Sequence, residues 1–227
     1  MLVLALDTSS PALSCALVEL RDARVARVLA ESLHLPPERH GDLLPAALLA
    51  LPAQAGLSLD DVQGLAVGLG PGSFTGLRVG LACAKSLAYA RKLPLAGASS
   101  LLALAEARLG IPTLEARRDE LYALIDGGEA AYRPAQLVER LNERPFILTG
   151  PGAAACKQAL LAAGVREEQF GQPGPPPARQ VAALCAERLQ GARYQQEAVF
   201  ALQPNYLQPS MAEVALAEGR VGGLPPR

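Results

Sequence analysis

The chain has 227 residues, of which 50% are hydrophobic, and a formal net charge of -1 at pH 7. This length and composition predict a globular protein with a sizeable buried core, built as one large domain or two small ones. The nearly balanced charge argues against strong nucleic-acid binding by the chain alone, because such binding requires a basic face. The 4 cysteines have no C-x-x-C spacing, so the sequence carries neither a zinc signature nor a disulfide framework.

The N-terminus predicts no targeting segment. The apolar run Leu2–Leu6 has no basic residues before it and meets Asp7 too soon for a signal peptide. No apolar run reaches the length that spans a membrane. We therefore expect a cytoplasmic protein that does not associate with membranes.

The first part of the chain predicts three strands and a helix. The strands are expected at Leu2–Leu6, Leu13–Leu20 and Arg24–Ser32, with the turn Asp7-Thr8-Ser9-Ser10-Pro11 joining the first two as a hairpin. The helix is expected over Asp42–Ala55, with Pro45 in its first turn and Gly56 as its stop.

A glycine-rich stretch, Gly70-Pro71-Gly72-Ser73-Phe74-Thr75-Gly76, joins a buried strand at Leu65–Leu69 to a helix at Leu77–Ala90. This build is typical of phosphate sites, because backbone N–H groups point outward at the helix start. It is equally typical of a closely packed corner between a strand and a helix. A Walker A loop is excluded, since no Gly-Lys-Ser/Thr follows, and the dinucleotide fingerprint fits poorly because its third glycine is missing.

Both predicted helices are apolar around more of their circumference than one core face requires. Leu44, Leu48 and Leu51 are joined by Leu43, Ala47 and Leu49 in the first helix, and Leu77, Leu81 and Leu87 by Val79, Cys83 and Ala84 in the second. One interpretation is that one face meets the sheet and the other a partner chain. Deep burial within one domain is the alternative, and the pattern alone does not decide between them.

The second half repeats the order of the first. It begins with a strand at Leu93–Ala98 and a helix from Ser99 or Ser100. Strands then follow at Ile111–Ala116, Leu121–Ile125 and Ala130–Tyr132, a helix at Pro134–Leu141, a strand at Phe146–Leu148, the turn Thr149-Gly150-Pro151-Gly152, and a helix over residues 153–163. A last helix is expected at Val181–Leu189 and an extended segment at Val199–Leu207. We therefore expect an α/β protein with duplicated βββαβα halves, residues 1–94 and 95–209, and a disordered tail at 210–227.

Two turns are candidates for nucleotide binding. Asp7, Thr8 and Ser9 could hold a phosphate and a magnesium ion, although a capped hairpin turn is the favoured interpretation of the motif alone. Gly150 and Gly152 could let a nucleotide approach the backbone closely, with an ordinary corner as the alternative. The histidines His34 and His40 do not have the spacing of a metal pair, and no motif for a catalytic nucleophile is present, so we predict neither a metal site nor a catalytic residue.

Several motifs together closely resemble the bacterial TsaB (YeaZ) family. They occur in order between Leu2 and Leu207 as Leu4-Ala-Leu-Asp-Thr-Ser9, His40-Gly-Asp-Leu-Leu-Pro45, Gly68-Leu-Gly-Pro-Gly-Ser-Phe-Thr-Gly-Leu-Arg-Val-Gly80, Glu115-Ala-Arg-Arg-Asp-Glu-Leu-Tyr122 and Pro204-Asn-Tyr-Leu207. The resemblance implies the two-lobed fold of actin, Hsp70 and sugar kinases, which is ribonuclease H-like. It also implies a non-catalytic role beside TsaD in making N6-threonylcarbamoyladenosine at position 37 of tRNAs that read ANN codons.

The resemblance further implies the partners. A TsaE-type ATPase docks on the pair with TsaD, TsaC-type enzymes supply threonylcarbamoyl-adenylate, tRNA meets the complex, and the chain alone forms a homodimer. The family uses its first two helices as the interface, for the homodimer and for the heterodimer with TsaD. Mapped onto this sequence, the interface residues are Leu43, Leu44, Ala47, Leu48, Leu51, Phe74, Thr75, Leu77, Arg78, Leu81, Ala84 and Lys85.

The sequence departs from the family pattern at Glu115, where an aspartate is usual, and at Gln208, where an arginine is common. No cofactor is firmly implied, and ATP or ADP with magnesium at the complex stays open. The rival interpretation is an autonomous ATP-dependent phosphotransferase of the same fold, which requires a catalytic carboxylate facing the nucleotide. A second acid for that role is not evident in the sequence.

Overall fold

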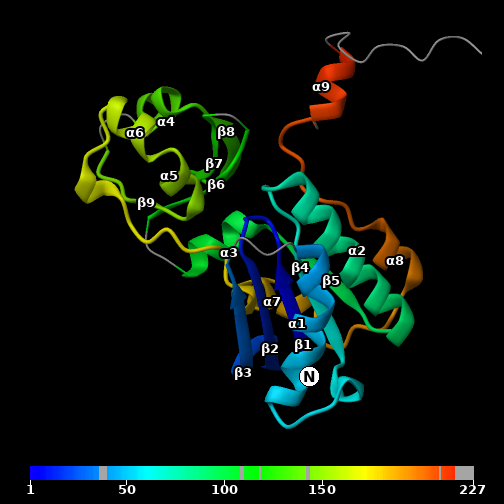
Figure 1. The fold of residues 1–227 in the computed structure, drawn as a ribbon. Helices are drawn as coiled ribbons and strands as arrows, with labels where there is room; N and C mark the ends of the chain where they lie inside the picture. The colour runs from blue at the N-terminus through cyan, green and yellow to red at the C-terminus, as the bar shows by residue number, and fades with distance from the viewer. Residues whose placement is uncertain (36–39, 108–109, 118, 142–143, 210, 218–227) are drawn as a thin grey trace, which may run out of the picture.

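The computed structural model describes residues 1–35, 40–107, 110–117, 119–141, 144–209 and 211–217. They form two α/β lobes, each built on its own sheet (Figure 1). Helix α3 (Ser100–Ala107) lies between the lobes. Its Ala103 packs with the core of the first sheet, whereas Leu101 and Leu104 pack against Leu114 of the second.

The N-terminal sheet has five strands in the order β3-β2-β1-β4-β5. The strands are β1 (Leu2–Asp7), β2 (Leu13–Arg21), β3 (Arg24–His34), β4 (Gly64–Gly68) and β5 (Leu95–Ala98). Strand β1 lies in the middle, antiparallel to β2 and parallel to β4. Its uninterrupted apolar sequence follows from this position, because helices cover both faces of the sheet.

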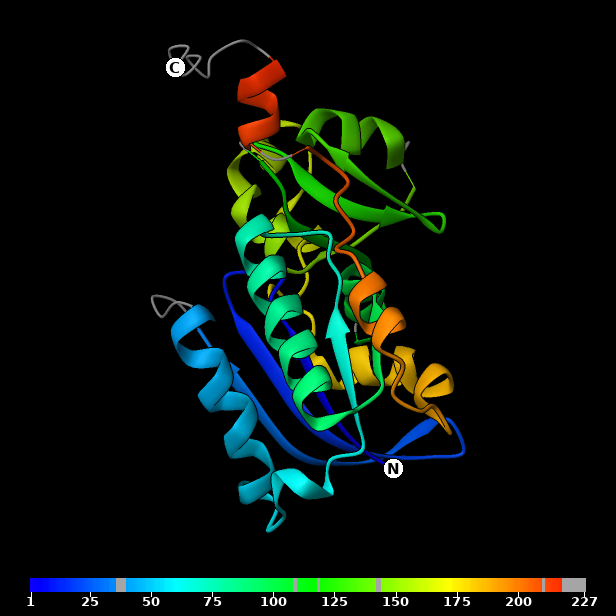
Figure 2. The same ribbon diagram turned by 90° about the vertical axis from the view of Figure 1, so that its right-hand side faces the viewer.

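Alternate side chains of β1 point to opposite faces, and each face has its own helices. Leu4 and Leu6 share a core with α1 (His40–Gln54) and α2 (Phe74–Arg91), which lie side by side across the sheet (Figure 2). Val3 and Ala5 share a core with α7 (Ala178–Leu189), on the other face. A short 3-10 turn, Leu59–Asp61, leads from α1 to β4.

The C-terminal sheet has four strands in the order β8-β7-β6-β9. They are β6 (Ile111–Glu115), β7 (Leu121–Ile125), β8 (Gly128–Tyr132) and the short β9 (Leu148–Thr149). Helices α4 (Pro134–Leu141), α5 (Pro151–Ala155) and α6 (Lys157–Ala162) cover one face, and a 3-10 turn at Glu167–Gln169 follows. Helix α3 covers the other face.

The chain ends by running back over both lobes. Helix α8 (Gln196–Ala201) lies along α2, and residues 202–209, which we call the strap, continue toward the C-terminal lobe (Figure 2). Helix α9 (Met211–Ala217) follows the strap and projects beyond the two lobes, although its Glu213 still lines a groove along α2 (Figure 1). The last described residue is 217.

The expected fold class is confirmed, since each half follows the order βββαβα on its own sheet. Several local expectations were wrong. Strand β5 completes the first sheet, so that sheet continues beyond the boundary expected at Pro94. The segment from Val199 starts inside α8 rather than extended, because its Val199 packs into the first core.

The tail expected to be disordered from residue 210 contains α9, and its residues 218–227 lie outside the described part of the chain. The single helix expected over 153–163 is two helices, which meet at Cys156. Helix α1 begins at His40, two residues before the expected start, which places Pro45 inside the helix instead of in its first turn.

Candidate functional site

The carboxylate of Asp7 is held by hydrogen bonds from within the chain. Its Oδ1 accepts from the backbone N–H of Ser9 at 2.9 Å and from the Ser9 hydroxyl at 2.6 Å. Its Oδ2 accepts from the Ser100 hydroxyl at 2.6 Å, and Ser100 Oγ in turn accepts the N–H of Gly70 at 3.1 Å. Asp7 is only 1% exposed. The carboxylate therefore ties the end of β1 to the start of α3 and to the glycine-rich turn.

Three glycines in or near the glycine-rich turn, Gly68, Gly72 and Gly80, lie in close contact with the turn that follows β1. A Cβ at Gly68 would lie 1.9 Å from Asp7 Oδ2, one at Gly72 would lie 2.1 Å from the Ser9 carbonyl oxygen, and one at Gly80 would lie 2.2 Å from Thr8 Oγ1. Side chains at these positions would therefore clash with the hairpin turn.

Hydrogen bonds close the same contact. Thr8 Oγ1 donates to the carbonyl of Gly76 at 2.8 Å, and the N–H of Ser73 donates to the carbonyl of Ser9 at 2.7 Å. Ser73 then caps α2, since its hydroxyl accepts the N–H of Gly76 at 3.2 Å. Of the two interpretations of the stretch, the geometry favours the packed corner.

Gly150 and Gly152 are buried and face the chain's own backbone. A Cβ at Gly150 would lie 2.3 Å from the carbonyl oxygen of Thr113, and one at Gly152 would lie 2.5 Å from that of Leu114. The Thr113 hydroxyl accepts the N–H of Ala153 at 2.7 Å and so fixes the start of α5 on β6. These glycines allow α5 to approach β6 closely, and they do not line the cavity between the lobes.

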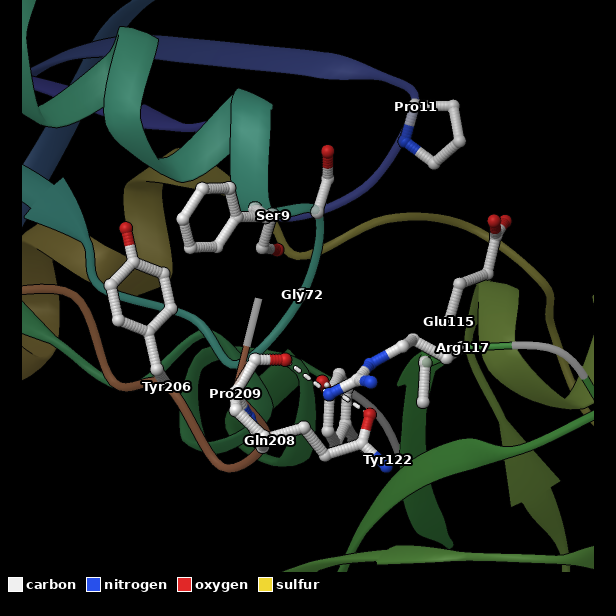
Figure 3. Close-up of a pocket in the computed structure, with 12 residues that line it drawn as sticks. Ser9, Pro11, Gly72, Glu115, Arg117, Tyr122, Tyr206, Gln208 and Pro209 are labelled. Atoms are coloured by element: carbon white, nitrogen blue, oxygen red, sulfur yellow. Dashed lines mark hydrogen bonds between the residues drawn. The ribbon is translucent and has the colours of Figure 1, made fainter. Parts of the chain in front are cut away.

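A cavity of about 300 Å³ lies between the two lobes (Figure 3). Its walls come from the hairpin turn, the start of α2, the β6–β7 hairpin and the strap. They consist of Ser9, Pro11, Gly72, Ser73, Phe74, Glu115, Ala116, Arg117, Tyr122, Tyr206, Gln208 and Pro209. Asp7 is not among them; its carboxylate is buried and accepts hydrogen bonds from Ser9 and Ser100.

Polar groups of the second lobe and the strap bond one another at the cavity wall. Tyr122 donates its hydroxyl to Gln208 Oε1 at 3.1 Å, and Gln208 Nε2 donates to Glu120 at 2.6 Å. Arg117 donates to the carbonyl of Pro209 (Figure 3). Burial raises the pKa of Glu115. Burial also raises the pKa of Tyr122, while the charge of Arg117 lowers it and that of Glu120 raises it by smaller amounts.

The predicted interface residues divide into buried and accessible groups. Seven of them lie 9% exposed or less within the chain's own fold and so offer a partner little surface: Leu44, Ala47, Leu48, Leu51, Leu77, Leu81 and Ala84. Leu43 is partly buried against the same core. Phe74, Thr75 and Arg78 are exposed at the start of α2.

Lys85 has a different role from the one expected. Its ammonium donates to the carbonyls of Phe200 at 2.9 Å and Leu202 at 2.7 Å, and so it holds α8 and the strap on α2. The outward face of α1 carries Leu49, which is 51% exposed, together with Ala46, Ala50 and Ala53. Leu49 was recognised in the sequence as apolar, but its exposure could only be seen in the fold.

Within the described ranges, no group of three or more His, Cys, Asp or Glu side chains could hold a metal ion. None of the helices in those ranges is both long enough and apolar enough to cross a membrane. The side chain of His40 is outside what the structure describes.

Comparison with known proteins gives a consistent result. The family described as "TsaD: tRNA N6-adenosine threonylcarbamoyltransferase" matches residues 34–216. A protein of Mycobacterium tuberculosis, described as uncharacterised, is 37% identical over 122 residues, which cover 53% of this chain and 56% of that protein. The Haemophilus influenzae "tRNA threonylcarbamoyladenosine biosynthesis protein TsaB" is 38% identical over 127 residues, which cover 53% of this chain and 51% of that protein.

The chain therefore matches about half the length of these curated relatives. A crystal structure of a Pseudomonas aeruginosa protein, described as having similarity to peptidase YEAZ, superposes with a TM-score of 0.71 at 25% identity. That superposition covers 91% of this chain and 99% of the Pseudomonas chain. The resemblance expected from the sequence motifs is confirmed by these similarities.

Proposed function

Since the chain belongs to the family of TsaD and TsaB (YeaZ) proteins, we propose that it is a non-catalytic partner of a TsaD-type enzyme. The pair would form N6-threonylcarbamoyladenosine at position 37 of tRNAs that read ANN codons. A TsaE-type ATPase and the tRNA would join this complex in the cytoplasm, and the chain alone would form a homodimer.

The observation that carries the non-catalytic role is the engagement of Asp7. A phosphotransferase of this fold needs a carboxylate that faces the nucleotide and its metal ion. Both carboxylate oxygens of Asp7 accept hydrogen bonds from Ser9 and Ser100, and Asp7 does not line the cavity between the lobes. Turning this carboxylate outward would break three hydrogen bonds in the centre of the protein.

The partner surface is proposed on the outward faces of α1 and α2. Leu49 and the exposed alanines of α1 form an apolar strip, and Ala82 lies exposed on the neighbouring helix. Small and apolar side chains let two helices approach closely, which suits a helix of a partner chain. The same strip would serve the homodimer when the enzyme is absent.

Reconstituted tRNA modification with a purified TsaD-type enzyme tests this proposal. Leu49→Asp places a charge on the proposed surface. The control variant, Ile147→Asp, replaces an apolar residue of the same size in the other lobe, whose side chain is 44% exposed. We expect Leu49→Asp to weaken binding to the enzyme by at least about tenfold, roughly 1.4 kcal/mol, and to lower the modification rate. Ile147→Asp should do neither. Leu44 and Leu81 are unsuitable for this test, because a charge at a buried position would unfold the chain.

Two results would overturn the proposal. The first is full modification by the TsaD-type enzyme without this protein. The second is a Leu49→Asp chain that binds and activates as well as the unaltered one. Turnover of ATP by the purified chain, abolished in a folded Asp7→Asn variant, would instead establish the autonomous phosphotransferase.

A further inference from the structure

The strap joins the two lobes at successive residues. Its start is fixed to the first lobe, because Lys85 of α2 bonds the carbonyls of Phe200 and Leu202. Asn205 then bonds both lobes at once. Its N–H donates to the carbonyl of Leu69 at 2.7 Å, and its side-chain amide donates to Glu129 of β8 at 2.6 Å.

The next residues alternate between the lobes. Tyr206 stacks on Phe74 of α2, with ring centroids 4.8 Å apart, whereas Gln208 bonds Glu120 and Tyr122 of the second lobe. Asn205, Tyr206 and Gln208 make these contacts within four consecutive residues, so the two lobes cannot separate on this side unless the strap releases one of them. The strap also supplies Tyr206, Gln208 and Pro209 to the wall of the cavity between the lobes (Figure 3).

The Phe74–Tyr206 pair borders a surface groove as well as the cavity. On its other side lies a groove of about 520 Å³ along α2, lined by Phe74, Arg78, Leu81, Ala82, Lys85, Gln203, Pro204, Tyr206 and Glu213. Phe74 and Tyr206 thus line both the groove and the cavity. Arg78 lies 5.3 Å from the centroid of the Phe74 ring, and Ala82, on the proposed partner surface, lines the same groove.

We propose that the strap is an interlobe latch, and that docking of the TsaD-type partner on α2 moves it and thereby opens or closes the cavity between the lobes. The docking step rests on the proposed function, whereas the latch itself does not. The cause is geometric: a partner that fills the groove beside Ala82 must contact Tyr206, and Tyr206 cannot move without its neighbours Asn205 and Gln208. Those two residues hold the second lobe.

A single tryptophan makes the latch observable, since the chain contains no tryptophan. Tyr206→Trp places the only such fluorophore on Phe74, and Tyr89→Trp places it at the far end of the same helix, at a side chain of similar exposure (47% against 43%). In the chain alone, adding Asn205→Ala and Gln208→Ala to Tyr206→Trp should shift its emission to the red. The same two substitutions should speed amide exchange in β7 and β8 by roughly tenfold. Gln196→Ala, at an exposed glutamine of α8 outside the strap and the groove, should change neither.

The second measurement adds the TsaD-type enzyme, with binding followed independently by calorimetry. We expect the emission of the Tyr206→Trp chain to shift on complex formation and that of the Tyr89→Trp chain to shift less. Binding without a change at position 206 would overturn the coupling and leave the proposed function standing. Absence of binding would overturn the proposed function. Unchanged emission and exchange after loss of Asn205 and Gln208 side chains would overturn the latch.

Discussion

The hydroxyl of Ser100 donates a 2.6 Å hydrogen bond to the carboxylate of Asp7, which lies 93 positions earlier in the chain. Ser100 Oγ also accepts the N–H of Gly70, so a single hydroxyl joins the first strand, the glycine-rich turn and the helix between the lobes. All three groups are buried. This hydrogen bond gives a structural role to Asp7, the only carboxylate of the predicted nucleotide site.

Ser100→Ala should lower the free energy of unfolding. The variant removes a donor to a buried carboxylate and an acceptor for a buried N–H, and each such loss costs about 1–3 kcal/mol. Urea denaturation followed by circular dichroism measures the change. Ser86→Ala, at an exposed serine of α2, is the matched control and should be neutral or slightly stabilising. Equal stability of the two variants would contradict the role given to Ser100.

Gly80→Ala should destabilise the protein although alanine favours helices by about 1 kcal/mol over glycine. The added methyl would lie 2.2 Å from Thr8 Oγ1 in a fully buried contact, and overpacking of this kind costs about 1–3 kcal/mol. Thr8→Ala removes the clashing oxygen, so the double variant should lose less stability than the sum of the single ones. A double-mutant cycle measures this coupling, and additive effects would show that the two residues do not meet.

Glu115→Gln should stabilise the protein at neutral pH and have little effect in acid. Burial raises the pKa of Glu115 above its ordinary value of 4.5. A raised folded-state pKa gives stability that is full below the unfolded-state pKa and is lost as the pH rises through the folded-state value. Glutamine does not ionise, so the Glu115→Gln variant does not lose this stability as the pH rises. Urea midpoints at pH 4 and pH 7 measure the difference, with the exposed Glu187→Gln as the background for removing one charge. A larger advantage of Glu115→Gln at pH 4 than at pH 7 would contradict the assignment.

The sequence predicts the local elements well because their signals are local. The apolar run at Leu2–Leu6 and the hydroxyl-rich turn after it specify the first hairpin, and the glycines specify the corner before α2. The partner surface was harder to predict. Val79, Cys83 and Ala84 were interpreted as surplus apolar residues, but Ala84 is buried in the chain's own core and the other two pack against that core.

Long-range contacts explain the remaining misassignments. Lys85 bonds carbonyls 115 and 117 positions away, which no helical pattern can reveal. Asn205 lies within the recognised Pro204–Leu207 motif, so its importance had a signal. Its partners, Leu69 just after β4 and Glu129 in β8, had none. Burial and exposure of the two helices therefore depend on where the last part of the chain folds back.

Alkylation of Cys83 should report on the partner surface. Burial raises the pKa of Cys15 to about 12 and that of Cys185 to about 11, which leaves almost no reactive thiolate at pH 8. Cys83 lies on α2 and is only partly buried, and burial raises its pKa as well. We therefore expect slow labelling of Cys83 in the folded protein. Cys15 and Cys185 should be labelled only after unfolding. Since Cys83 follows Ala82, a TsaD-type partner on α2 should slow its reaction further.

Iodoacetamide labelling with peptide mass spectrometry measures each cysteine separately, and Cys185 in the same sample serves as the internal control for unfolding. Labelling of Cys83 at an unchanged rate in a complex proven by calorimetry would place the partner on another face.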